Sequence, residues 1–161
     1  PAVAFGANFY FEYKGFDLTL FFQGVGGQQV ITKDFKQQTD LWSGVNVANL
    51  NKGTRVLDAW SPSNPNSDIP ALSTNNNNNE ARVNTYFVED GSFLKLRNLQ
   101  LGYNLPKNAC DKMKMQNWRW FVSAQNVFTI HSAKFTGVDP EVPTFGYPIP
   151  LTVTLGTKVT F

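Results

Sequence analysis

The last twelve residues alternate between apolar and polar side chains, and this pattern limits the possible fold more than any other feature. Because side chains point to opposite faces along a β-strand, one face would be apolar and the other polar. The apolar set is Leu151, Val153, Leu155, Val159 and Phe161, interrupted only by Thr157; the polar set is Thr152, Thr154, Gly156, Lys158 and Thr160. A two-faced strand that ends on an aromatic residue is typical of a sheet with lipid on one side and a wet lumen on the other.

Four other segments alternate with the same period of two, and no segment carries an apolar stripe with helical spacing. Lys14-Gly15 lies between the first two segments and predicts a tight hairpin turn. We therefore expect an all-β chain of five antiparallel strands, near residues 3–13, 16–23, 93–105, 117–130 and 151–161.

The third segment departs from the pattern at its start. Leu94 and Leu96 are apolar, whereas Lys95 and Arg97 are charged, and Leu99 begins a regular apolar series of the opposite parity. Two explanations fit. Either a β-bulge shifts the register, or this end of the strand rises out of lipid.

The connections between these segments alternate between short and long. Residues 14–15 and 106–116 are the short connections, and residues 24–92 and 131–149 are the long ones. In bacterial outer-membrane barrels the periplasmic turns are short and the external loops are long. This order predicts extracellular loops at 24–92 and 131–149 and a periplasmic C-terminus. The alternative is a β-sandwich with an aromatic core.

Composition excludes several classes of protein. The 161 residues carry a net charge of only +2, which gives no reason to expect nucleic acid as a partner. A single cysteine, Cys110, excludes an internal disulfide, and a single histidine, His131, excludes a site with two imidazoles. No apolar run reaches eighteen residues. Because the sequence begins at Pro1 without a methionine, we expect it to be part of a longer protein.

Six segments, in the same order, resemble the C-terminal region of the SusC/RagA family of TonB-dependent outer-membrane transporters. The most characteristic is residues 90–106, Asp-Gly-Ser-Phe-Leu-Lys-Leu-Arg-Asn-Leu-Gln-Leu-Gly-Tyr-Asn-Leu-Pro. The others are residues 13–24, 59–70, 123–129, 136–141 and 147–156. Each segment alone is a weak signal, but the ordered set spans nearly the whole chain.

The resemblance implies a parent barrel of roughly 22 strands with a plug in its lumen. This chain would supply the last five strands, while the plug and the TonB-contacting region would lie elsewhere. The family's partners would be a SusD-like surface lipoprotein, TonB, outer-membrane lipid, and an oligosaccharide or peptide substrate. Phe161 would match the barrel assembly signal. The resemblance implies no cofactor.

Aromatic side chains in the long loop are candidate substrate contacts. Sugar rings stack on aromatic faces, so Trp42, Trp60 or Tyr86 could form a platform. Each could equally pack the loop onto itself or onto a partner. The asparagine run at 75–79 could bind a glycan, although a solvated loop tip explains it as well.

Two cations, Arg119 and Lys158, fall on the polar parity and are candidates for contacts with the lumen or the plug. Lys95 and Arg97 would join them only if a bulge shifts the register. The loop acids Glu89, Asp90, Asp139 and Glu141 match no EF-hand spacing, and a turn set by Pro140 explains the last two better than a calcium site.

Two functions remain at this point. The first is part of a SusC-like importer of oligosaccharides or peptides, which is not an enzyme and holds no metal. The second is a soluble β-sandwich that binds carbohydrate. No phosphate-binding loop, catalytic triad or Cys/His cluster occurs in the sequence.

Overall fold

The computed structural model describes residues 1–39, 53–72, 82–144 and 146–161, and it divides into two compact units. The sheet unit contains residues 1–28, 92–131 and 149–161. The loop unit contains residues 29–91 and 132–148. The loop unit consists almost entirely of the two long connections, so these connections pack together as a compact unit.

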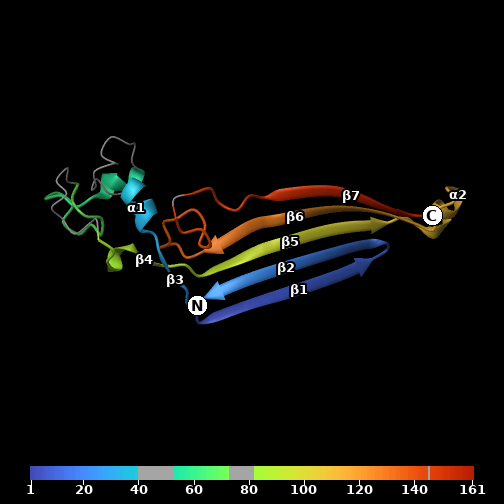
Figure 1. The fold of residues 1–161 in the computed structure, drawn as a ribbon, viewed down its shortest axis with the longest axis horizontal. Helices are drawn as coiled ribbons and strands as arrows, with labels where there is room; N and C mark the ends of the chain where they lie inside the picture. The colour runs from blue at the N-terminus through green and yellow to red at the C-terminus, as the bar shows by residue number, and fades with distance from the viewer. Residues whose placement is uncertain (40–52, 73–81, 145) are drawn as a thin grey trace. The chain divides into compact units, whose positions relative to one another are not determined.

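The sheet unit is one antiparallel sheet of five strands in the order β1-β2-β5-β6-β7, as Figure 1 shows. Its strands are β1 (Val3–Tyr13), β2 (Phe16–Gly26), β5 (Phe93–Asn104), β6 (Asn117–His131) and β7 (Thr152–Thr160). The predicted all-β antiparallel fold is confirmed. Each strand pairs with the next long strand along the chain, which keeps the sheet a simple meander.

The strand register gathers the apolar parities on one face of the sheet. Leu18 of β2 lies opposite Phe11 of β1 and Leu101 of β5, and Leu101 in turn faces Val122 of β6. This face is open: Leu155 on β7 is 74% exposed, and Phe9 on β1 is 46% exposed. A β-sandwich would require a second sheet over this face, and no other strand of the sheet unit covers it in the described residues.

Two β-bulges at one level explain the irregular start of the third predicted strand. Arg97 is an extra residue against β2, and the β5–β6 register also shifts between Leu96 and Asn98. At the same level of β6, Asn126 adopts a left-handed backbone conformation with a φ of 55°. The shift leaves Leu96 opposite Phe22 and Phe128 on the apolar face. The bulge is therefore the correct one of the two predicted explanations.

The second strand runs beyond the predicted residue 23 to Gly26. Gly24 pairs with Phe5, and a side chain at Gly24 would collide with the Phe5 ring. Glycine at position 24 therefore leaves room for the Phe5 ring, and the strand continues past it to Gly26.

The loop unit has regular structure that sequence reasoning did not predict. Strands β3 (Gln29–Ile31) and β4 (Val88–Asp90) form a small antiparallel sheet. Helix α1 (Lys33–Thr39) follows β3, and the 3-10 helices η1 (Thr54–Asp58) and η3 (Thr85–Phe87) lie farther along the chain. Phe87 and Thr32 are completely buried. These elements were missed because each is too short to show a periodic pattern: α1 contains only one apolar residue, Phe35.

Two other connections contain a short helix and a hydrogen-bonded turn. A short helix, α2 (Lys107–Lys112), lies in the sheet unit within the short connection predicted at residues 106–116. In the loop unit, Val142 donates its backbone N–H to the carbonyl of Asp139 at 2.9 Å, which closes the turn predicted at Pro140. Among the described residues, no helix is long and apolar enough to cross a membrane.

Candidate functional site

The polar face of the sheet carries an ion pair between β2 and β6. Arg119 donates from Nε to Asp17 Oδ2 at 3.1 Å and from Nη2 to Asp17 Oδ1 at 2.5 Å. Both side chains are largely buried, and the guanidinium carbon lies 5.5 Å from the centre of the Phe121 ring. Two parallel hydrogen bonds to one carboxylate hold the guanidinium in a single orientation.

The ion pair passes over Gly102, which lies on the strand between its two partners. A Cβ atom at Gly102 would collide with both carboxylate oxygens of Asp17 and with Nη2 of Arg119. Glycine is therefore required here for space. Sequence reasoning selected Arg119 and missed Asp17, although the alternation of β2 already placed Asp17 on the polar parity.

Lys158 lies directly opposite Arg119 across the β6–β7 pair. Like charges that face each other on neighbouring strands are destabilising. Asp17 neutralises Arg119, whereas Lys158 is exposed and has no ion-pair partner among the described residues. The structure therefore places both predicted cations on the polar face but gives a carboxylate only to the first.

The bulges bring a second pair of cations to the polar face. Arg97 donates from Nε to Gln23 at 2.6 Å and from Nη1 to Asn126 at 3.2 Å, so it bridges β2 and β6. Lys95 is almost fully buried, and its ammonium nitrogen lies 5.4 Å from the centre of the Phe93 ring. The prediction that these two residues join the polar face if a bulge is present is confirmed.

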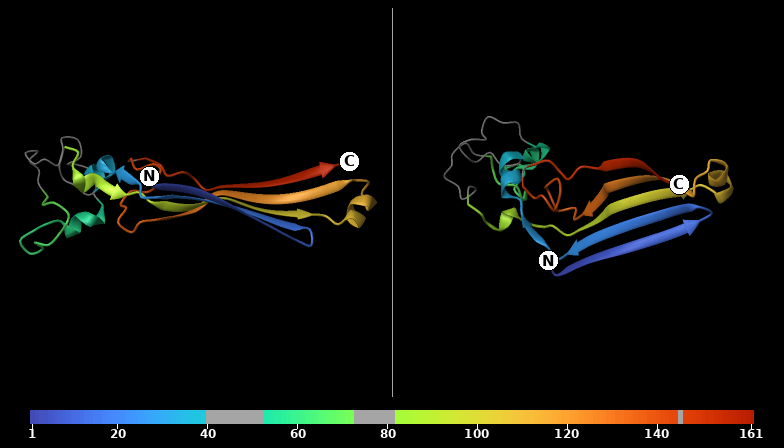
Figure 2. Two further views of the ribbon diagram at one scale, coloured as in Figure 1. Left: turned by 90° about the horizontal axis from the view of Figure 1, so that it is seen from below. Right: turned by 45° about the vertical axis from the view of Figure 1, so that its right-hand side comes forward.

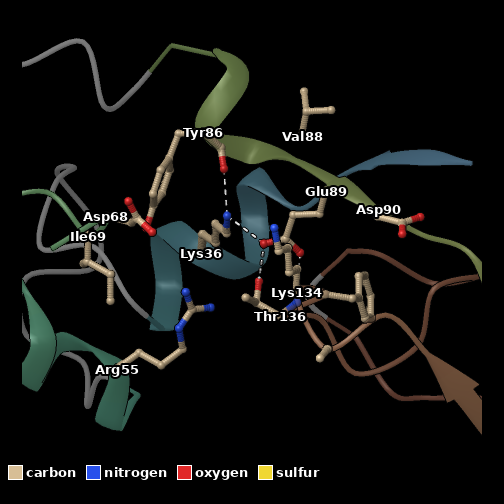
Figure 3. A pocket seen from close by; sticks show the side chains of 12 residues that line it. Lys36, Arg55, Asp68, Ile69, Tyr86, Val88, Glu89, Asp90, Lys134 and Thr136 are labelled. Atoms are coloured by element: carbon tan, nitrogen blue, oxygen red, sulfur yellow. Dashed lines mark hydrogen bonds and ion pairs between the residues drawn. The ribbon is translucent and has the colours of Figure 1, made fainter. Parts of the chain in front are cut away.

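The loop unit contains a pocket of about 660 Å³, shown in Figure 3. Half of its lining residues are charged, with three cations and three acids, while Tyr86, Phe135, Ile69 and Val88 supply apolar surface. The charged residues are Lys36, Arg55, Lys134, Asp68, Glu89 and Asp90. Such a lining offers hydrogen bonds and charges of both signs to a polar ligand.

A buried ion pair forms one wall of this pocket. Lys36 Nζ lies 2.6 Å from Glu89 Oε1 and donates to the carbonyl of Tyr86 at 2.7 Å. Thr136 donates its backbone N–H and its hydroxyl to the two Glu89 oxygens at 2.9 and 2.8 Å. The dashed lines in Figure 3 follow this set of contacts, which joins α1, η3, β4 and the second long connection.

These contacts determine the protonation of Glu89. Burial acts to raise the pKa of its carboxyl group, but the hydrogen bonds from Lys36 and Thr136 outweigh burial and hold the pKa below its ordinary value of 4.5. Glu89 is therefore a carboxylate at neutral pH, and its oxygens are already occupied by protein donors.

The structure places the three aromatic candidates differently. Tyr86 lines the pocket, and its ring lies 4.2 Å from Lys36 Nζ. Trp60 is 45% exposed and donates its backbone N–H to Ile69, but it does not line this pocket. Trp42 and the asparagine run at 75–79 lie outside the described residues. Sequence reasoning missed Lys36, Arg55 and Lys134, because separate segments carry them and no motif marks them.

The remaining candidate residues have simpler surroundings. Asp139 accepts a hydrogen bond from the backbone N–H of Glu141 at 3.0 Å, as expected of a turn. In the described parts of the chain, no group of three or more His, Cys, Asp or Glu side chains could hold a metal ion. Phe161 directly follows β7 and is exposed.

Comparison with known proteins connects these features. TonB-dependent receptor P3 of Formosa agariphila is 36% identical over 141 residues, which cover 88% of this chain and 13% of that protein. TonB-dependent receptor P26 of the same organism is 30% identical over the whole chain and 17% of its own length. Structures of the RagAB peptide transporter, and of the RagAB peptide importer in its closed-closed state, match 98% of the chain with a TM-score of 0.73 at 27% and 28% identity. This chain is a SusC/RagA-like part of a TonB-dependent receptor.

The receptor segment is a small part of the proteins it matches. It spans about one sixth of their length or less. No protein-family model matches its sequence. Its relatives are named as receptors and as a transporter, and none of those names describes an enzyme.

Proposed function

We propose that this segment forms part of the barrel wall of an outer-membrane TonB-dependent importer. The observation that carries the proposal is the continuous apolar face of the five-stranded sheet, whose opposite face is polar and charged. Lipid would cover the first face, and the plug and the lumen water would meet the second. The two unpaired edges, β1 and β7, would pair with the rest of the barrel, since open edges are untenable in lipid.

Lys158 is the proposed contact for the plug. Lys158 lies opposite Arg119 on the neighbouring strand, and Asp17 already neutralises Arg119, so Lys158 is the cation that a carboxylate from the plug would neutralise. Lys158→Glu in the complete receptor should loosen the plug and let a bulky antibiotic such as vancomycin enter the cell. Lys33→Glu, in the loop unit, is the matched control. If cells with either variant are equally resistant to vancomycin, Lys158 does not contact the plug.

The loop unit would face the cell exterior and contact a SusD-like lipoprotein and the substrate, an oligosaccharide or a peptide. Its charged pocket and Tyr86 are the proposed substrate contacts. Tyr86→Ala in the complete receptor–lipoprotein complex should weaken substrate binding about tenfold, since stacked or hydrogen-bonded contacts contribute on the order of 1–2 kcal/mol. The matched control is Tyr147→Ala, because Tyr147 is exposed and lies outside the pocket.

Deletion of the gene and growth on defined substrates test the import function. A strain without the receptor should lose growth on one class of polymer, either a glycan or a peptide, and the complete gene should restore it. The proposal fails if the complete receptor stays monodisperse in water without detergent. It also fails if the receptor sediments with the soluble fraction of the cell.

A further inference from the structure

The apolar face of the sheet is not flat. It contains a hollow of about 180 Å³, whose lining includes Phe16, the first residue of β2 after the β1–β2 turn. The hollow spans four strands, from β2 to β7, and its lining is almost entirely apolar. The side chains on the apolar face that line it are Phe16, Leu101, Tyr103, Trp120, Val122 and Leu155.

Aromatic rings from three strands, those of Phe16, Tyr103 and Trp120, line this hollow. The rings of Phe16 and Tyr103 lie 4.5 Å apart, and those of Trp118 and Trp120 lie 5.5 Å apart. The indole N–H of Trp118 donates to Thr157 Oγ1 at 2.8 Å, and that hydroxyl donates to the carbonyl of Arg119 at 3.2 Å. This chain of hydrogen bonds explains why Thr157 interrupts the apolar parity of β7: it holds the indole in place.

Positive charge gathers just beyond the same end of the sheet. The β1–β2 turn, the β5–β6 connection that contains α2 and the C-terminus all lie at this end of the sheet in Figures 1 and 2. Together, residues 14–15 and 106–116 hold four exposed lysines and one acid, Asp111. The lysines are Lys14, Lys107, Lys112 and Lys114. They have no carboxylate partner among the described residues, and Lys14 lies over the Tyr13 ring at 5.1 Å.

We propose that this end of the receptor segment binds one phospholipid with an anionic headgroup. Part of one of its acyl chains would occupy the hollow, and the lysines would contact its phosphate. Burial from water cannot select one lipid here, because the surrounding acyl chains are equally apolar. The shape of the surface must select it, and the hollow lined by aromatic rings supplies that shape. Basic groups next to the apolar surface then select negative headgroups, at roughly fivefold in affinity for each lysine.

The inference rests on the proposed membrane placement, so the test uses the complete receptor purified in mild detergent. The receptor is mixed with equal amounts of phosphatidylglycerol and phosphatidylethanolamine, and native mass spectrometry counts the lipids that stay bound. The expected result is one retained phosphatidylglycerol and at least tenfold less phosphatidylethanolamine. The triple variant Lys107→Gln/Lys112→Gln/Lys114→Gln should lose this preference, whereas Lys33→Gln in the loop unit should keep it.

A second pair of variants tests the hollow itself. Leu155→Trp fills the hollow and should abolish lipid retention, whereas Val153→Trp changes the same face of the same strand outside the lining and should not. Equal retention by both variants, equal retention of the two lipids, or displacement of phosphatidylglycerol by free phosphate overturns the inference. A receptor that folds in detergent and imports substrate, yet retains no lipid, refutes the lipid site and leaves the import function intact.

Discussion

Replacing Glu89 with glutamine should open the loop unit and leave the sheet intact. The carboxylate is 5% exposed and its partner Lys36 is 6% exposed, so the substitution leaves a buried ammonium group without the carboxylate that pairs with it. Breaking one side of a buried ion pair costs about 3–5 kcal/mol. Thr136 also loses charge-assisted hydrogen bonds, which are stronger than neutral ones. Both side chains are almost fully buried, so water screens little of this loss.

Hydrogen exchange in the complete receptor measures this opening. The loss of about 3–5 kcal/mol predicts that amides of the loop unit, such as those of Thr32 and Thr136, exchange at least about 100-fold faster. Amides of the sheet unit should be unaffected, because the contacts of Glu89 all lie within the loop unit.

Two further variants test the electrostatic reasoning. Asp34→Asn removes an exposed acid from the first turn of α1 and should change exchange by less than about threefold. Lys36→Met/Glu89→Leu removes both buried charges of this pair and should recover part of the protection that Glu89→Gln loses. The ion pair does not hold the loop unit together if the loop-unit amides of Glu89→Gln exchange as slowly as those of the wild type. The same conclusion follows if they exchange as fast in the double variant as in Glu89→Gln.

Three other outcomes are expected. Phe161→Ser should lower the amount of receptor assembled in the outer membrane, measured by immunoblot, without changing substrate affinity in the assembled fraction; unchanged levels would exclude the assembly role. Gly102→Val should displace the Asp17–Arg119 ion pair and lower the thermal midpoint, whereas Gly26→Ala, which has open space around it, should not. The protection of the loop unit should also depend on pH. Because the pKa of Glu89 in the folded protein lies below 4.5, the carboxylate's contribution to the stability of the loop unit is fully present above pH 4.5. This contribution is lost as the pH falls through the folded pKa, and hydrogen exchange measured at a series of acidic pH values would detect the loss.

Much of the sheet unit could be predicted because each strand is a local pattern. The alternation of side chains determines which residues share a face, and this requires no knowledge of the neighbouring strand. The bulge was visible only as a conflict of parity at Lys95 and Arg97. Only the pairing of β5 with β2 and β6 shows that the cause is a bulge, because a bulge is an extra residue relative to a neighbouring strand.

The loop unit and the ion pairs could not be predicted in the same way. Lys36, Glu89 and Thr136 are separated by about fifty residues at each step, and no motif connects them. Their elements have between three and seven residues, too few for any periodicity to appear. Tyr86 was selected for its ring alone, and the charges around it became visible only in the folded unit.

The sequence by itself determined the two-faced strands, their antiparallel meander and the membership of a SusC/RagA-like receptor, because these depend on residue type and on spacing within single segments. Only the tertiary structure decided which cation meets which carboxylate. Asp17 and Arg119 are 102 residues apart, and they meet because the register places Gly102 between them. Ion pairs and pockets depend on distances between segments, and chain folding alone determines those distances.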